Sequence, residues 1–515
     1  MLLIEYRFQW ANLQIKQLLT LLTIEDILDR LGKLPRDLKE AYDGIYLTKE
    51  KQAKALVDRA CMWVMCACTP LTTVELISAI SIDPDVDKES SAIDEDLLGD
   101  LCDNLLFIDP ERKVWRFTHL SVMEYFEDNH WGLRQAHCHA AKVCLKLLIK
   151  TYGDQWSESK VQRLSDQEPE DIFDLAHPFQ NYLWHHWVIH VRSYDKQVGD
   201  PAEADVMLAG LLKNFLGSPK ESSVQYRRWH SRFDSLNKVQ PWSSWLYMAR
   251  HSEICPADVP TYVMCRFSFY ILLRDWWKCA DIDVSHVNAA GDNLLVLAAV
   301  AGCVQICKRL IERGMLVNTP LHSGNPLAAA AEGGSIEIVE FLVQEGKADV
   351  NMVLQCGDYG SALAAAAWRG QTEIVKFLVQ EGKADVNMVL QCGDYGSALA
   401  AAAEGGSIEI VKFLVQEGKA DVNMIIKCGN FGSPLAAAAY CGHKVCVEVL
   451  IEAGAETNCQ LENGRFRTCL QASQANFSRE DRCRTWWDQR TEKCVKLEKA
   501  EVAELLVRHG ATNEE

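Results

Sequence analysis

The stretch from Asn351 to Val386, NMVLQCGDYGSALAAAAWRGQTEIVKFLVQEGKADV, recurs almost unchanged from Asn387 to Val422, which gives a repeat period of 36 residues. The two copies differ at only four positions. A period of this length is typical of proteins built from stacked structural repeats. With the leucine of the alanine-rich segment as reference, the pattern occurs six times, at Leu295, Leu327, Leu363, Leu399, Leu435 and Leu470.

Each unit has the pattern of two short helices. In the third, a turn at 357–360 precedes a helix expected over 362–367, and Gly370 ends it. Apolar residues at helical spacing over 374–378 predict a second, amphipathic helix. We expect Gly382 to end this helix in the left-handed conformation. One unit cannot bury its apolar face alone, so the units must stack.

The fifth unit resembles the ankyrin repeat, on the residues Pro434-Leu435, Ala438-Ala439, Gly442-His443, Val449-Leu450 and Gly454-Ala455-Glu456-Thr457-Asn458. The resemblance implies a helical solenoid that binds proteins. The middle units depart from it by an additional lysine, Lys347, Lys383 or Lys419.

The last unit is longer, because an insertion of 21 residues falls at about 474–494. It contains arginines and two tryptophans, a mixture that suits stacking on nucleic acid. Acidic residues interleave with the basic ones, however, so we expect an exposed loop or an intervening sequence left in the gene product.

The N-terminal half predicts helices followed by a hairpin. Thr72 to Glu75 and Ser121 to Glu124 have the pattern of capping boxes, in which the first residue caps the helix that follows. Residues 105–108 and 114–117 are strand-like runs separated by a turn. This order predicts a winged helix. Its helix over 73–80 displays Glu75 and no arginine or lysine, so we expect a structural role and no DNA contact.

This half resembles the segment that follows the nucleotide-binding NACHT module in fungal NACHT-ankyrin receptors, on Leu34 to Tyr42, Pro70 to Leu76 and His119 to Phe126. The same winged-helix region is described for an inositol-deacylase family. The resemblance implies a mostly α chain. Residues 1–50 would be the helical end of a NACHT module, and residues 51–132 a winged-helix-like domain. Residues 133–282 would form a helical linker, and residues 283–515 the six ankyrin repeats.

Composition limits the classes of partner and the cellular compartment that we expect for this protein. The net charge of −18 disfavours nucleic acid and anionic membranes. The 20 cysteines form no C-x-x-C pair, which indicates reduced thiols in a cytoplasmic protein. The N-terminus has no signal-peptide pattern.

No pattern of catalytic or metal-binding residues stands out. Five of the 14 histidines lie close together in the sequence, in two groups: His137 with His139, and His185 with His186 and His190. They lack the H-E-x-x-H spacing and tryptophans flank the second group, so we expect packed or surface histidines rather than zinc ligands. There is no G-x-S-x-G either. We therefore predict no catalytic residue, cofactor or metal, and no enzymatic activity.

The four differences between the near-identical units place the predicted binding surface. Trp368 and Arg369 replace Glu404 and Gly405, and two further changes follow in the turn. In an ankyrin stack these positions lie beside the fingers, the turns that project from each repeat. The predicted partner-binding residues are Trp368, Arg369, Glu404, Tyr359, Tyr395 and Phe431.

The function that the resemblance implies is the sensing and regulatory half of an NLR-like signalling receptor, with a protein ligand in the ankyrin groove. A free-standing ankyrin adaptor or inhibitor is the alternative. A regulatory subunit associated with a hydrolase is a weaker one.

We predict that this chain does not bind ATP. No G-x-x-x-x-G-K-[ST] motif occurs in the sequence, so the backbone cradle for phosphate and the hydroxyl for Mg²⁺ are missing. Isothermal titration with Mg-ATP should give no saturable heat, and a stoichiometric isotherm would contradict the prediction.

Overall fold

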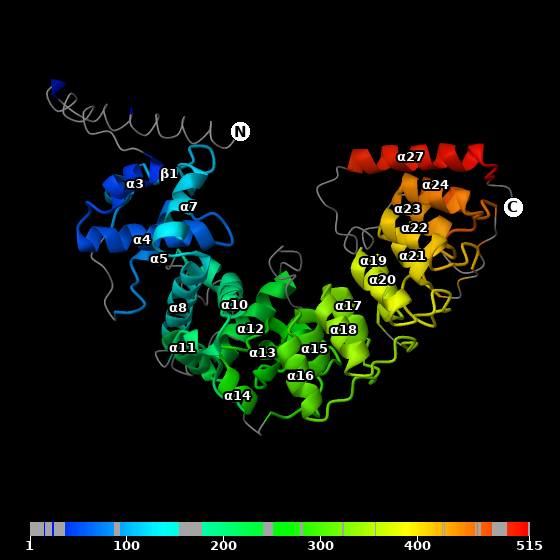
Figure 1. Ribbon diagram of the computed structural model, residues 1–515, viewed down its shortest axis with the longest axis horizontal. Helices are drawn as coiled ribbons and strands as arrows, with labels where there is room; N and C mark the ends of the chain where they lie inside the picture. The colour runs from blue at the N-terminus through cyan, green and yellow to red at the C-terminus, as the bar shows by residue number, and fades with distance from the viewer. Residues whose placement is uncertain are drawn as a thin grey trace. The chain divides into compact units, whose positions relative to one another are not determined.

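The structure is a computed structural model, and the residues it describes are 15, 23–24, 37–86, 93–102, 104–153, 178–239, 251–278, 282–321, 324–355, 357–424, 426, 428–458, 461, 465–475 and 492–512. The chain forms two compact units, residues 1–251 with 271–279, and residues 252–270 with 280–515. Figure 1 labels their helices and strands. Most of the segment predicted for 1–50, and most of the insertion at 474–494, lie outside the described residues.

The first unit begins with the predicted helices and hairpin. The strands pair antiparallel, with Leu106 opposite Phe117, so the predicted hairpin is confirmed. The elements in order are α3 (Leu38–Tyr46), α4 (Lys51–Cys66), α5 (Thr73–Ile80), α6 (Glu95–Leu101), β1 (Leu106–Ile108), β2 (Trp115–Phe117) and α7 (Leu120–Asn129).

One predicted capping box is confirmed and the other is wrong. The Thr72 side chain accepts the N–H of Glu75, whose carboxylate accepts the N–H of Thr72. In α7, however, the cap is His119, whose Nδ1 accepts the N–H of Ser121 at 3.1 Å. The imidazole takes the position expected for a hydroxyl, so the helix begins two residues earlier than the Ser121 pattern predicts.

Helices are also the main elements in the described remainder of the first unit. Edge-to-face rings form part of its core, with Trp187 5.1 Å from Phe215 and 5.4 Å from Trp229. The Asp195 carboxylate accepts the N–H groups of residues 271 and 272, which ties the returning segment to this unit. The elements are α8 (Leu133–Thr151), α10 (Gln180–Gln197), η2 (Pro201–Glu203), α11 (Val206–Leu216), α12 (Val224–Val239) and α14 (Arg274–Lys278).

In the second unit, helix pairs stack in chain order (Figure 1). η4 (His251–Ile254) leads to α13 (Thr261–Phe267), which packs on the first inner helix. The inner helices are α15 (Leu294–Ala301), α17 (Pro326–Gly333), α19 (Ala362–Trp368), α21 (Ala398–Glu404), α23 (Pro434–Cys441) and α25 (Cys469–Gln474). The outer helices are α16 (Val304–Glu312), α18 (Ile336–Gln344), α20 (Thr372–Gln380), α22 (Ile408–Gln416), α24 (Lys444–Glu452) and α27 (Glu492–Arg508).

The residue that ends the third outer helix in the left-handed conformation is not the predicted Gly382. Lys383, the additional lysine of the middle units, has φ +56°, whereas Gly382 does not have a positive φ. The glycine is needed for space, since a Cβ there would lie 2.8 Å from the Leu378 carbonyl oxygen. In the fifth unit, which has no additional lysine, Gly454 does take the left-handed position, with φ +91°.

An asparagine after each of the first five outer helices binds the next unit at two points. The Nδ2 of Asn351 donates to the Lys383 carbonyl at 3.1 Å, and its Oδ1 accepts the N–H of Asp385 at 2.7 Å. Asn387 repeats both bonds with Lys419 and Asp421. We call this series, formed by Asn318, Asn351, Asn387, Asn423 and Asn458, the asparagine ladder.

We expect that deleting residues 387–422 leaves a folded but less stable protein. The deletion joins Val386 to Asn423, which has the ladder role of Asn387, so every remaining rung keeps a partner. One interface between units is lost, and stability in such stacks is roughly a sum over units and interfaces. Circular dichroism should show unchanged helicity per residue and a lower Tm. Loss of the helical signal would contradict the stack.

A pair of glycine variants distinguishes the cost of a left-handed backbone conformation from the cost of a steric clash with the neighbouring unit. Gly360 and Gly454 both have positive φ, but a Cβ on Gly360 would lie 2.6 Å from the Cys392 carbonyl oxygen, and one on Gly454 would meet nothing within 4 Å. Gly454→Ala should lower the free energy of unfolding by about 1 kcal/mol, and Gly360→Ala by roughly 2 to 4 kcal/mol. Urea denaturation measures both, and equal losses would mean that the finger does not approach its neighbour.

Candidate protein-binding surface

Two rows of side chains follow the stack of inner helices. The first row takes the residue five positions after each reference leucine, and along the stack it consists of Val300, Glu332, Trp368, Glu404 and Tyr440. The second row takes the residue four positions before the leucine, in the finger, and consists of Tyr359, Tyr395, Phe431 and Phe466. The first row thus changes from acidic to aromatic and back between successive units.

Trp368 lies against the rings of its own finger and of the next. The centroid of its ring is 5.8 Å from that of Tyr359 and 5.9 Å from that of Tyr395. The two tyrosine rings stack on each other at 6.0 Å and 12°. Both tyrosines are only 7% exposed, whereas Trp368 is half-buried. The tyrosines are therefore the support, and the tryptophan is the part that solvent reaches.

A cation and a carboxylate hold the polar edge of this cluster. The Arg369 guanidinium lies 4.7 Å from the centroid of the Trp368 ring, and its Nη2 is 2.6 Å from Oε1 of Glu332 in the preceding unit. The Tyr359 hydroxyl donates to the same oxygen at 3.0 Å. Burial, with the Glu332 charge as a further cause, raises the pKa of Tyr359 far above its ordinary value, so the hydroxyl stays a donor at neutral pH.

A second aromatic cluster, two units further on, is covered by the protein itself. Tyr440 lies 5.2 Å from both Phe431 and Phe466, but it is 2% exposed. The Lys499 ammonium of α27 lies 4.3 Å above its ring. This cluster repeats the ring arrangement around Trp368, and α27 packs on the helix that carries Tyr440.

The predicted site residues divide by exposure. Tyr359, Tyr395 and Phe431 are buried in the stack, while Trp368, Arg369 and Glu404 are half-buried at its surface. Sequence reasoning missed Glu332, although the five-residue offset from Leu327 gives it directly. We define the Trp368 surface as Trp368, Arg369, Glu332 and Glu404.

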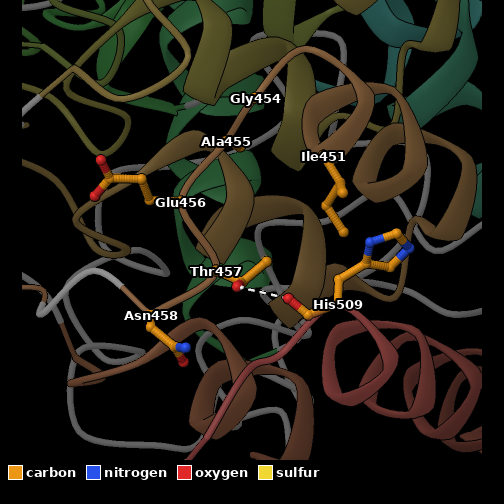
Figure 2. Close-up of a pocket in the computed structure, with 7 residues that line it drawn as sticks. All are labelled: Ile451, Gly454, Ala455, Glu456, Thr457, Asn458 and His509. Carbon is orange, nitrogen blue, oxygen red and sulfur yellow. Dashed lines mark hydrogen bonds between the residues drawn. The ribbon is translucent and has the colours of Figure 1, made fainter.

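A depression of about 480 Å³ lies between the fifth and last units, and Figure 2 shows its lining. The Thr457 hydroxyl donates to the His509 carbonyl at 3.2 Å, and Asn458 forms the last rung of the asparagine ladder. Both polar side chains are thus already engaged with the next unit. The depression is therefore part of the contact between these two repeat units.

Metal-ligating side chains come together in the first unit. The structure joins His137 of one histidine group to His190 of the other, at 3.0 Å between their Nδ1 atoms, with Cys66 beside them. His185 is separate, with its Nδ1 2.8 Å from the Asn181 carbonyl oxygen. The described helices include none that is long and apolar enough to span a membrane.

Comparisons with known proteins match two regions of the chain. Residues 268–354 and 363–460 match the family described as ankyrin repeats (3 copies). Residues 46–136 match the family described as GPI inositol-deacylase, winged helix domain.

Among the proteins similar to parts of the chain are a curated protein and a solved structure. Azaphilone pigments biosynthesis cluster protein L of Monascus ruber is 27% identical over 181 residues, which cover 31% of this chain and 36% of that protein. The crystal structure of the human ASB11 ankyrin repeat domain is 22% identical with a TM-score of 0.35, over 43% of this chain and 95% of that one. The chain thus spans little more than a third of the curated relative. It carries a winged helix domain of the GPI inositol-deacylase kind, followed by ankyrin repeats.

Proposed function

We propose that this chain is a non-catalytic scaffold that binds a protein partner through the Trp368 surface. The observation that carries the proposal is a half-buried tryptophan that lies against two buried tyrosine rings, which stack on each other, at a position where both neighbouring units have glutamate. A large ring on a rigid support loses little conformational entropy on binding. Tryptophan and arginine are also the residue types most enriched in binding hot spots.

The chemistry of the Trp368 surface favours a polypeptide partner. An aromatic face, a guanidinium and two carboxylates lie within three consecutive units, which suits a segment that offers both apolar and charged side chains. Arg369 is already paired with Glu332, so the surface gives phosphates no unpaired arginine. The net charge of −18 opposes nucleic acid and anionic lipid at long range.

The biological setting that we propose is the sensing and regulatory half of an NLR-like signalling receptor in the cytoplasm. The order of the parts supports it, because a winged helix domain, a helical segment and ankyrin repeats follow one another as in the receptors that the sequence resembles. Buried thiols such as those of Cys61, Cys102 and Cys144 suit a reducing compartment. The alternative is a free-standing adaptor or inhibitor, for which the same surface would serve.

A weaker alternative is a regulatory part of a hydrolase, which the name of the winged helix family suggests. The two settings predict different partners. A receptor should co-purify with a nucleotide-binding signalling protein, and a hydrolase regulator with an esterase activity. Affinity purification of the full chain, with nucleotide and esterase assays of what is retained, distinguishes them.

We expect a Trp368→Glu/Arg369→Gly double variant to weaken partner binding by at least about 2 kcal/mol, the usual hot-spot threshold. The variant gives the third unit the residues that the fourth already has in the same backbone, so the fold should be preserved. Trp368→Ala should lose as much affinity, with some loss of stability because Tyr359 and Tyr395 lose a packed ring. Calorimetry against the purified partner measures the affinity, and Tm reports the fold.

Lys376→Ala is the matched control on the outer helix. Lys376 pairs with Glu373 and Glu409 on the surface, away from both rows, so its loss should leave the affinity unchanged. Equal losses from Lys376→Ala and the double variant, or full affinity in the double variant, would place the binding site elsewhere.

A further inference from the structure

Three helices of the first unit bring two imidazoles and a thiol to one buried point. Cys66 ends α4, His137 lies in α8 and His190 in α10. Cys66 is 5% exposed, His137 8% and His190 0%. One nitrogen of each histidine and the Cys66 sulfur all lie within 4.8 Å of one another. We call these three residues the Cys66 cluster.

A second layer of hydrogen bonds orients His190. Its Nε2 lies 2.8 Å from the Tyr182 hydroxyl, which also accepts the backbone N–H of Cys68 at 3.0 Å. When Nε2 carries the proton and donates to Tyr182, the lone pair of Nδ1 is on the side of the His137 ring. Metal-ligating histidines in proteins are usually fixed in this way, by a hydrogen bond from the ring nitrogen that does not bind the metal.

We propose that the Cys66 cluster binds a zinc ion, with the Cys66 sulfur and the Nδ1 atoms of His137 and His190 as ligands. Imidazole and thiolate are the donors that zinc prefers, whereas Mg²⁺ and Ca²⁺ take oxygen. Ligand bonds of about 2.0 to 2.3 Å in a tetrahedron put the donor atoms roughly 3.3 to 3.6 Å apart. The 3.0 Å between the two Nδ1 atoms needs only a slight opening to reach this spacing.

The ion would fasten the winged helix region to the helical segment behind it. α8 packs on both α4 and α10, and one ligand comes from each of the three helices. The Cys66 cluster has three members, which leaves the fourth position of a tetrahedron to a water molecule. Two further thiols lie outside the cluster. Cys68 donates its backbone N–H to the Tyr182 hydroxyl, and Cys144 lies about two turns after His137 in α8.

The competing interpretation is an ordinary core pair, in which one Nδ1–H donates to the other Nδ1 and Cys66 stays a thiol. Burial suits neutral groups, since it lowers the pKa of His137 to about 4 and raises that of Cys66. Zinc binding keeps both imidazoles neutral and replaces the thiol proton, which goes to solvent as the sulfur–zinc bond forms. Only the metal interpretation predicts a cobalt–thiolate bond.

The test uses the full chain, freed of metal by a chelator and titrated with Co²⁺. We expect one Co²⁺ per chain, the intense visible bands of a four-coordinate ion, and a thiolate-to-cobalt charge-transfer band that Zn²⁺ abolishes by displacement. Cys66→Ala should remove the charge-transfer band. Tyr182→Phe, which keeps the ring, should weaken Co²⁺ binding roughly tenfold or more with the band unchanged.

Cys144→Ala is the matched control, because it removes a buried thiol close to the Cys66 cluster. It should bind Co²⁺ as the unaltered chain does, and circular dichroism checks that each variant is folded. Absence of a charge-transfer band in the unaltered chain would overturn the proposal whatever the variants do. So would a band that survives Cys66→Ala, or one lost equally in Cys144→Ala.

Discussion

The close approach of neighbouring inner helices is the constraint on which the repeat unit of this protein depends. Ala364 to Ala367 are completely buried, and methyl side chains let helix backbones come nearer than larger residues would. That spacing fixes the distance between successive fingers, and the rings of Tyr359 and Tyr395 stack at 6.0 Å as a result. A flat ring placed at the end of an inner helix then touches both fingers, as Trp368 does. The candidate binding surface is thus a consequence of alanine packing beneath it.

The asparagine ladder secures the same spacing from the opposite end of each unit. Asn351 and Asn387 satisfy one backbone carbonyl and one N–H of the following unit, so their partners do not depend on side-chain identity. Positions that touch neither the alanine core nor this ladder are then open to change. The four differences between the near-identical units all fall over 368–372, after the buried alanines of the inner helix. The change is not free at every one of them, since a Cβ on Gly405 of the fourth unit would lie 2.5 Å from the Trp368 carbonyl oxygen.

The sequence predicted the repeat, its helices and the hairpin because these follow from local periodicity and turn residues. It did not predict which of two neighbouring residues takes the left-handed conformation at the end of a helix. Gly382 and Lys383 lie side by side, and the approach of the Leu378 carbonyl, which only the folded helix creates, reserves the glycine for space. The burial of Tyr359 was likewise hidden, because it depends on the adjacent unit. The Cys66 cluster lay beyond pattern analysis, since its members are on three helices far apart in the chain.

The alternation of acidic and aromatic residues along the first row explains how a partner can bind in a single register on a repetitive surface. Identical units present identical contacts, so a ligand would bind in several registers shifted by one unit with equal free energy. Specificity for one register requires a difference between units. Trp368 and Glu404 supply it, since a partner side chain that packs on the tryptophan in one register meets a carboxylate in the next. The residues beneath the first row differ too. The Tyr359 hydroxyl donates to Glu332. Phe431, in the finger that follows Glu404, has no hydroxyl and cannot make the corresponding contact. Small changes on a constant scaffold are therefore sufficient to convert a periodic stack into a surface with one preferred alignment.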